Sequence, residues 1–143
     1  MSSPIRLVTP VVETPSRALG AYAPRVGVVA DAVALLVQDA ARDLAKGIFV
    51  ESGADLELTA IVTRLEPDSH DRPFACAQIV IEVIRGETRQ TVYTRKVESE
   101  VRRLLQAPVP MDDPKFPRTA LGRASVSCLR SLFTAVADTF GQP

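Results

Sequence analysis

The segment FACAQIVIEVI, residues 74–84, decides the fold because its side chains fall on two faces of different character. The first face is wholly apolar and consists of Ala77, Ile79, Ile81 and Val83. The second face is mixed and includes Cys76, Gln78 and Glu82. A period of two residues with one apolar face predicts a strand that is half-buried in a sheet.

The segments on either side of residues 74–84 extend this pattern. Residues 55–65 alternate in the same way, and residues 88–101 are again rich in β-forming side chains. A polar loop over 66–73 and a turn at 85–87, where Gly86 is able to take a positive φ, join the three segments. Three consecutive strands with short links predict an antiparallel meander.

Two segments have the period of an amphipathic helix. In the first, apolar residues recur at helical spacing behind Asp31, a potential N-cap, and Gly47 is placed for a left-handed C-terminal residue. In the second, Thr119 is a potential N-cap and the helix runs to Phe140. The apolar stripe of the second helix consists of Leu121, Ser125, Cys128, Leu132 and Val136, widened by Leu129, Phe133 and Phe140.

The N-terminal segment, residues 1–24, is predicted to be partly irregular. Residues 5–12 are typical of a strand, but Pro10 cannot donate to a ladder and so predicts an edge position or a bulge. Residues 13–24 hold prolines and a glycine and predict a loop. Short β-rich runs at 25–29 and 48–50 predict two further brief strands.

The predicted fold class is therefore α+β, with a mostly antiparallel sheet and two amphipathic helices packed on one of its faces. A chain of 143 residues suits one domain, so residues 1–143 are predicted to form a single domain. This arrangement is expected because each helix has one apolar stripe and the sheet has one apolar face, and packing them together buries all three.

Charge and composition argue against several classes of function. The chain has 17 Lys+Arg and 17 Asp+Glu, so its formal net charge is +0, and this is a poor basis for a nucleic-acid binder. Aromatic residues are 5% of the chain and tryptophan is absent, which disfavours stacking platforms for single strands. The sequence contains no run of 18 consecutive apolar residues, so no transmembrane helix is predicted.

Candidate catalytic residues are few. His70 is the only histidine, and it lies with Asp68 and Asp71 in a hydrophilic segment that is more typical of a solvated turn than of a metal site. No glycine-rich phosphate-binding motif occurs. Cys76 and Cys128 fall on opposite sides of the predicted sheet, so both thiols are expected to be free. We therefore predict no enzymatic activity, no cofactor and no metal site.

The proline-rich loop over 106–117 is the segment with most promise for recognition. Its prolines stiffen it, and long structured loops on a rigid scaffold often bind partners. The alternative is a plain connector from the sheet to the last helix. The candidate partner-binding residues, with the apolar members expected to be exposed, are Val109, Met111, Asp112, Asp113, Lys115 and Phe116.

The order of elements, with two short motifs, resembles the YajG-like and ABC-type transport auxiliary lipoproteins of bacterial envelopes. The carrying residues are Asp43-Leu44-Ala45-Lys46-Gly47-Ile48-Phe49-Val50 and Gly53-Ala54-Asp55-Leu56-Glu57-Leu58, followed by Val92-Tyr93-Thr94 and the closing helix. The similarity extends over about residues 25–140. It implies a non-enzymatic envelope component that binds partner proteins or lipid-handling machinery.

Two features depart from that group. The lipidated cysteine that follows a leader is missing, and the 106–117 loop is longer than expected. The resemblance therefore predicts a periplasmic or outer-membrane-anchored protein if a leader has been removed, with the membrane reached only through a lipid anchor absent from this sequence. If no leader has been removed, we expect a cytoplasmic protein instead.

The leading hypothesis is a non-catalytic accessory or assembly domain that binds protein partners. The alternative is a cytoplasmic or virus-encoded structural subunit that self-assembles into a homo-oligomer.

Overall fold

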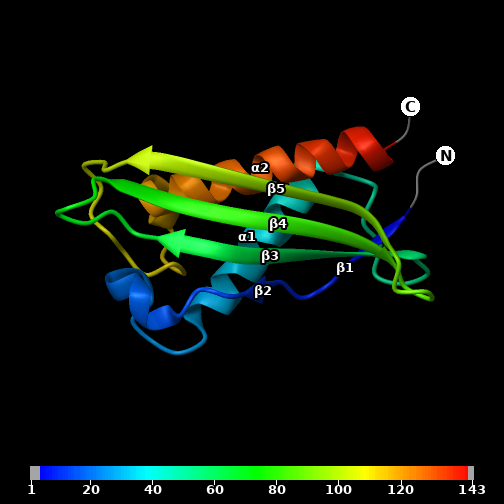
Figure 1. Ribbon diagram of the computed structural model, residues 1–143, viewed down its shortest axis with the longest axis horizontal. Coiled ribbons are helices and arrows are strands. Elements are labelled where there is room, and N and C mark those ends of the chain that lie inside the picture. The colour runs from blue at the N-terminus through cyan, green and yellow to red at the C-terminus, as the bar shows by residue number, and fades with distance from the viewer. Residues whose placement is uncertain (1–3, 142–143) are drawn as a thin grey trace.

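The computed structural model describes residues 4–141, which form a five-stranded mixed sheet with helices on one face (Figure 1). The strands are β1 (Ile5–Leu7), β2 (Val11–Val12), β3 (Leu56–Glu66), β4 (Phe74–Arg85) and β5 (Thr91–Arg102). β3, β4 and β5 form an antiparallel meander, while β1 and β2 both lie parallel to β3 at the sheet edge. The predicted α+β class with a mostly antiparallel sheet is confirmed.

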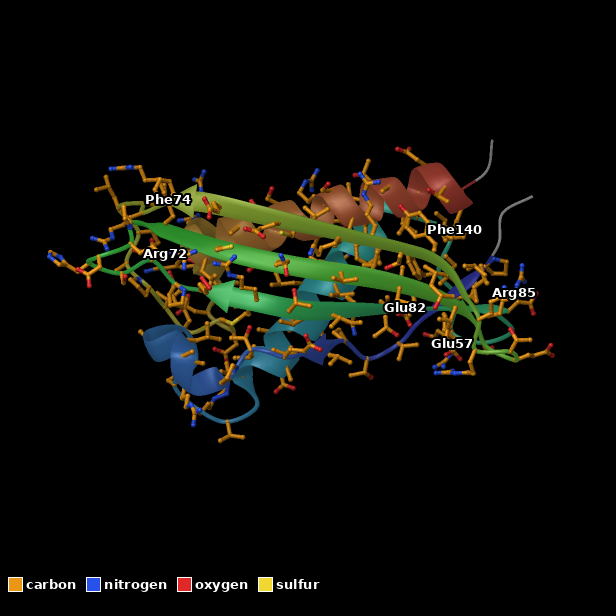
Figure 2. The ribbon with its side chains drawn as sticks, viewed as in Figure 1. Glu57, Arg72, Phe74, Glu82, Arg85 and Phe140 are labelled. Atoms are coloured by element: carbon orange, nitrogen blue, oxygen red, sulfur yellow. The ribbon has the colours of Figure 1, made fainter. Side chains whose placement is uncertain are left out.

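Alternation along the strands places the core on one face of the sheet. The predicted apolar face of β4 is buried, as are the matching positions of β3, which are Leu56, Leu58, Ala60 and Val62. Glu57 and Glu82 fall on the opposite face, and Figure 2 shows their side chains on the same part of the sheet. Since only this face of the sheet is apolar throughout, the two α-helices pack on it.

The helices are η1 (Ser16–Tyr22), α1 (Val28–Leu44), η2 (Phe116–Arg118) and α2 (Ala120–Phe140), where η denotes a 3₁₀-helix. α2 packs on β4 and β5 and contacts α1. Thr119 caps α2 as predicted, because its Oγ1 accepts a hydrogen bond from the Gly122 N–H at 3.0 Å. The predicted stripe of α2 is buried from Leu121 to Val136, and Phe140 packs partly against the core.

The start of α1 differs from prediction. The strand predicted at 25–29 is absent, because the helix begins at Val28 and Gly27 is its N-cap with φ 86°. Asp31 therefore lies in the first turn and is not the cap. The apolar Val28 and Val29 are buried as helix positions. At the other end Gly47 has φ 86°, the predicted left-handed conformation.

The N-terminal strand forms in two pieces. The strand predicted over 5–12 is divided into β1 and β2, and the interruption includes Pro10, which has no N–H to donate. The predicted edge position is confirmed, because among the strands of residues 4–141 β1 and β2 pair with β3 alone. The predicted strand at 48–50 is reduced to one bridge between Phe49 and Ile5. The predicted loop over 13–24 contains η1.

The turn between β4 and β5 is longer than predicted. Arg85 and Gln90 close it, with the Arg85 N–H donating to the Gln90 carbonyl at 2.9 Å. The left-handed residue in this turn is Arg89, with φ 60°, and not Gly86. Gly86 instead donates its N–H to the Asp55 carbonyl at 2.9 Å, which ties the turn to the start of β3.

Candidate protein-binding surfaces

The structure corrects the predicted exposure of the 106–117 loop. Met111 and Phe116 are buried, with 4% and 1% of their surfaces exposed. The Phe116 ring packs edge-on against Tyr22 at a centroid distance of 5.9 Å, and the Met111 N–H donates to the Tyr22 carbonyl at 2.9 Å. These two apolar side chains therefore anchor the loop to the core and present no apolar surface to a partner.

The other predicted residues of the loop are less buried. Val109 packs partly against the core, and Lys115 is exposed. Asp112 forms an ion pair with Arg25, and the Asp113 carboxylate accepts the Lys115 N–H at 2.8 Å. Both acids thus already have partners within the protein. Partner binding by these residues stays a prediction.

The segment around His70 is a turn supported by ion pairs. Asp68 accepts a hydrogen bond from Arg103 Nε at 2.8 Å, and Arg72 pairs with Glu66. His70 and Asp71 are exposed. Within residues 4–141, the group of side chains close enough to share a metal ion does not include His70.

That group lies on the open face of the sheet and consists of Cys76, Glu98 and Glu100, whose ligand atoms are within 4.8 Å of one another. The β4–β5 register brings them together, because Cys76 pairs with Glu100 and Gln78 with Glu98. Gln78 Nε2 lies 2.8 Å from one Glu98 oxygen, and Arg64 Nη1 lies 3.4 Å from the other. Sequence spacing could not indicate this cluster, since it depends on the strand register.

The two thiols are both buried and free, and they lie on opposite sides of the sheet, as predicted. Burial raises the pKa of the Cys76 thiol. Burial raises the pKa of Cys128 to about 12, and its Sγ lies 3.3 Å from the Ala77 carbonyl oxygen. Both thiols therefore stay protonated near neutral pH, which is the unreactive form of cysteine.

A groove lies between α1 and the edge strand β1. It has a volume of about 330 Å³, and its lining is mostly apolar. Its walls come from Leu7 on β1, from Ala41 on α1, from Ala45, the C-cap of α1, and from Phe49 in the connection that follows. Gln38, Arg42 and Lys46 add polar groups to its lining. A second hollow, lined by Val8, Pro10 and Ala34, shares Leu7 with the groove and continues along the same edge.

The backbone beside this groove is that of an edge strand. On the outer side of β1, the Ile5 N–H donates to the Ile48 carbonyl at 3.0 Å and the Ile5 carbonyl accepts the Val50 N–H at 2.9 Å. On the inner side, the Val8 N–H donates to the Leu58 carbonyl of β3 at 2.9 Å. Since backbone groups alternate direction along a strand, the N–H and C=O of Leu7 point outward like those of Ile5. Apolar side chains nearby are also exposed, Leu35 at 59% and Val11 at 47%.

Comparison with known proteins shows that the fold is shared with solved structures, but it does not assign the chain to a family. No family model matches the chain, and no curated protein matches it. The hypothetical protein CT253 from Chlamydia trachomatis superposes with a TM-score of 0.68 at 7% identity, over 99% of this chain and 98% of that one. The PelC dodecamer from Paraburkholderia phytofirmans gives a TM-score of 0.61 at 8% identity, over 93% and 86%. Lipoprotein GNA1162 from Neisseria meningitidis gives 0.52 at 11% identity, over 96% of each chain.

These similarities establish a shared fold with a lipoprotein and with proteins whose names state no enzymatic activity. This agrees with the lipoprotein-like part of the sequence resemblance. The YajG-like group in particular is not identified by the comparisons. Neither α1 nor α2 combines the length and the apolar character needed to span a membrane, within the part of the chain that the structure describes.

Proposed function

We propose that this chain is a non-catalytic component of a bacterial envelope that binds an extended segment of a partner protein in the groove beside β1. The observation that carries the proposal is the pairing of an apolar groove with the outward backbone of Leu7. The fold shared with a lipoprotein supports the envelope location.

The groove has the two properties required for strand addition. Residues 48–50 already occupy the outer side of β1 at Ile5, with both backbone hydrogen bonds formed. A partner segment in line with residues 48–50 would meet the next outward N–H and C=O, those of Leu7. Alternate side chains of that segment would then contact the apolar wall formed by Ala41, Ala45 and Phe49. Main-chain hydrogen bonds would supply affinity, and the wall would supply specificity.

Site-specific photo-crosslinking in the native host tests the groove. A photoreactive residue at Gln38, on the groove wall, is expected to crosslink one defined protein, which membrane fractionation should place in the envelope. The same probe at Thr88, in the exposed β4–β5 turn, is the control. Gln38→Trp should fill the groove and abolish crosslinking from a probe at Lys46, whereas Thr88→Trp should not. Equal crosslinking from both positions would contradict the proposal.

A second candidate function is self-assembly, favoured by the dodecameric state named for PelC, which shares this fold. Sedimentation velocity of the purified chain over a range of concentrations tests it. A concentration-dependent oligomer that Gln38→Trp dissociates would make a second copy the occupant of the groove. A monomer at every concentration would remove this candidate and leave the first.

A further inference from the structure

An arginine-rich hollow lies on the outer surface of α2, near its N-terminus. It has a volume of about 460 Å³ and is lined by Pro117, Arg118, Arg123, Val126, Ser127 and Arg130. The three arginines are exposed, and no acidic residue lines the hollow. Among the described residues 4–141, the ion pairs are formed by other arginines. Three guanidinium groups therefore meet in one hollow without an ion-pair partner among the described residues.

The fold brings these arginines together from two elements. Arg123, Ser127 and Arg130 have the spacing i, i+4 and i+7, which places them on one face of α2. Arg118 comes from η2, which is held against the first turn of α2. Gly122 permits that contact, because a Cβ at this position would lie 1.8 Å from the Phe116 carbonyl oxygen.

The chemistry of the hollow fits a phosphate group. A guanidinium group is planar and presents paired N–H donors that match two phosphate oxygens. The Ser127 hydroxyl adds another donor. The positive end of the α2 dipole lies beside Arg118 and Arg123, and its effect falls off before Ser127 and Arg130. A bound anion would also relieve the mutual repulsion of the three arginines.

We propose that Arg118, Arg123, Ser127 and Arg130 form a binding site for a phosphate group, supplied either by a soluble phosphate compound or by an anionic phospholipid headgroup. This site lies on α2 and η2, whereas the groove lies on α1 and β1, so the proposal does not rest on the proposed function. Figure 1 shows α2 beginning at the end of the sheet where β5 ends.

The first test is a titration of the full chain with inorganic phosphate at constant ionic strength, followed by ¹H–¹⁵N NMR. Saturable shifts are expected for the amides and guanidinium groups of 118–130. The triple variant R118Q/R123Q/R130Q should lose these shifts. R118K/R123K/R130K should weaken binding at least tenfold, because lysine keeps the charge and loses the paired donors.

The matched control is R85Q/R89Q/K96Q, which removes the same charge elsewhere. Arg85 ends β4 and Arg89 lies in the turn that follows it, and Figure 2 shows Arg85 at the end of the sheet opposite Arg72. Lys96 lies on the open face of the sheet. The control should bind phosphate like the unmodified chain. Shifts that are absent, that survive in the Gln variant, or that fall equally in the control would overturn the proposal.

The second test distinguishes the two sources of the phosphate group. The chain is sedimented with vesicles of phosphatidylcholine, with and without phosphatidylglycerol. At least tenfold stronger binding to the phosphatidylglycerol vesicles, lost in the Gln variant, would identify a headgroup as the ligand. Phosphate-dependent NMR shifts without vesicle binding would identify a soluble phosphate compound. Failure of both tests would refute the site, while crosslinking in the groove would be unaffected.

Discussion

Gly122 offers a direct test of how η2 is held against α2, through the substitution Gly122→Ala. The new Cβ would lie 1.8 Å from the Phe116 carbonyl oxygen, 2.6 Å from its carbonyl carbon and 2.9 Å from Pro117 Cα. These neighbours are backbone atoms, so no side-chain rotation relieves the clash. The Phe116 carbonyl also accepts hydrogen bonds from the N–H and the hydroxyl of Thr119, at 3.0 and 2.7 Å. Displacing η2 would therefore strain the N-cap of α2 as well.

The expected loss follows from two opposing effects. Overpacking with a backbone shift costs about 3 kcal/mol. Replacing glycine by alanine in a helix returns at most about 1 kcal/mol. The free energy of unfolding of Gly122→Ala should thus fall by about 2 kcal/mol in urea denaturation followed by circular dichroism. Gly86→Ala is the control, because its Cβ would meet its nearest neighbour at 3.6 Å, an ordinary contact. Equal stability of the Gly122 variant and the unmodified chain would refute the close-approach argument.

Three further predictions concern a carboxylate, the thiols and the loop anchor. Two arginines hold the pKa of Glu66 at about 2, below its usual 4.5, so Glu66→Gln should cost about 1 kcal/mol after allowance for solvent screening. The difference should be full above pH 4.5 and disappear as the pH falls towards 2, measured by urea unfolding at several pH values. Cys76 and Cys128 should react with a thiol reagent at neutral pH only after denaturation, and rapid labelling of the native chain would contradict their burial. Met111→Ala should cost about 2–4 kcal/mol by leaving a cavity, whereas Val109→Ala, at a partly buried position, should cost less than half as much.

The regular elements with one buried face were predictable from sequence. The period of two in residues 74–84 appears in β4 as a buried face and a mixed face. The period of α2 appears as a buried stripe, and its cap at Thr119 is a local hydrogen bond that the sequence can encode within three residues. In both elements local preference and tertiary burial favour the same answer, so sequence reasoning succeeds.

The errors fall where a local preference competes with another signal. Val28 and Val29 are β-branched, which favoured a strand at 25–29. In the structure the left-handed Gly27 is the N-cap of α1, and both valines are buried as the first residues of that helix. Gly86 was the natural choice for a left-handed turn residue. The turn closes only at Gln90, so the left-handed conformation falls on Arg89 instead.

The candidate surfaces were harder to predict, for a physical reason that the 106–117 loop illustrates. An apolar side chain in a polar loop looks the same in the sequence whether it packs into the core of its own chain or is exposed to bind a partner. Met111 and Phe116 are anchors, and only their packing against Tyr22 shows this. The outcome depends on a contact between segments about ninety residues apart, which no local pattern contains.

The same reasoning explains why both proposed surfaces emerged only from the structure. The groove brings together Leu7, Ala41 and Phe49, each of which is an ordinary apolar residue in the sequence. The arginine-rich hollow joins Arg118 to α2 through a contact that requires Gly122 to lack a side chain. In the sequence that glycine resembles a weak point in a helix, where it costs about 1 kcal/mol relative to alanine. The close approach of η2 accounts for the glycine. If the proposed phosphate site is formed by both elements, Gly122→Ala should weaken phosphate binding as well as stability.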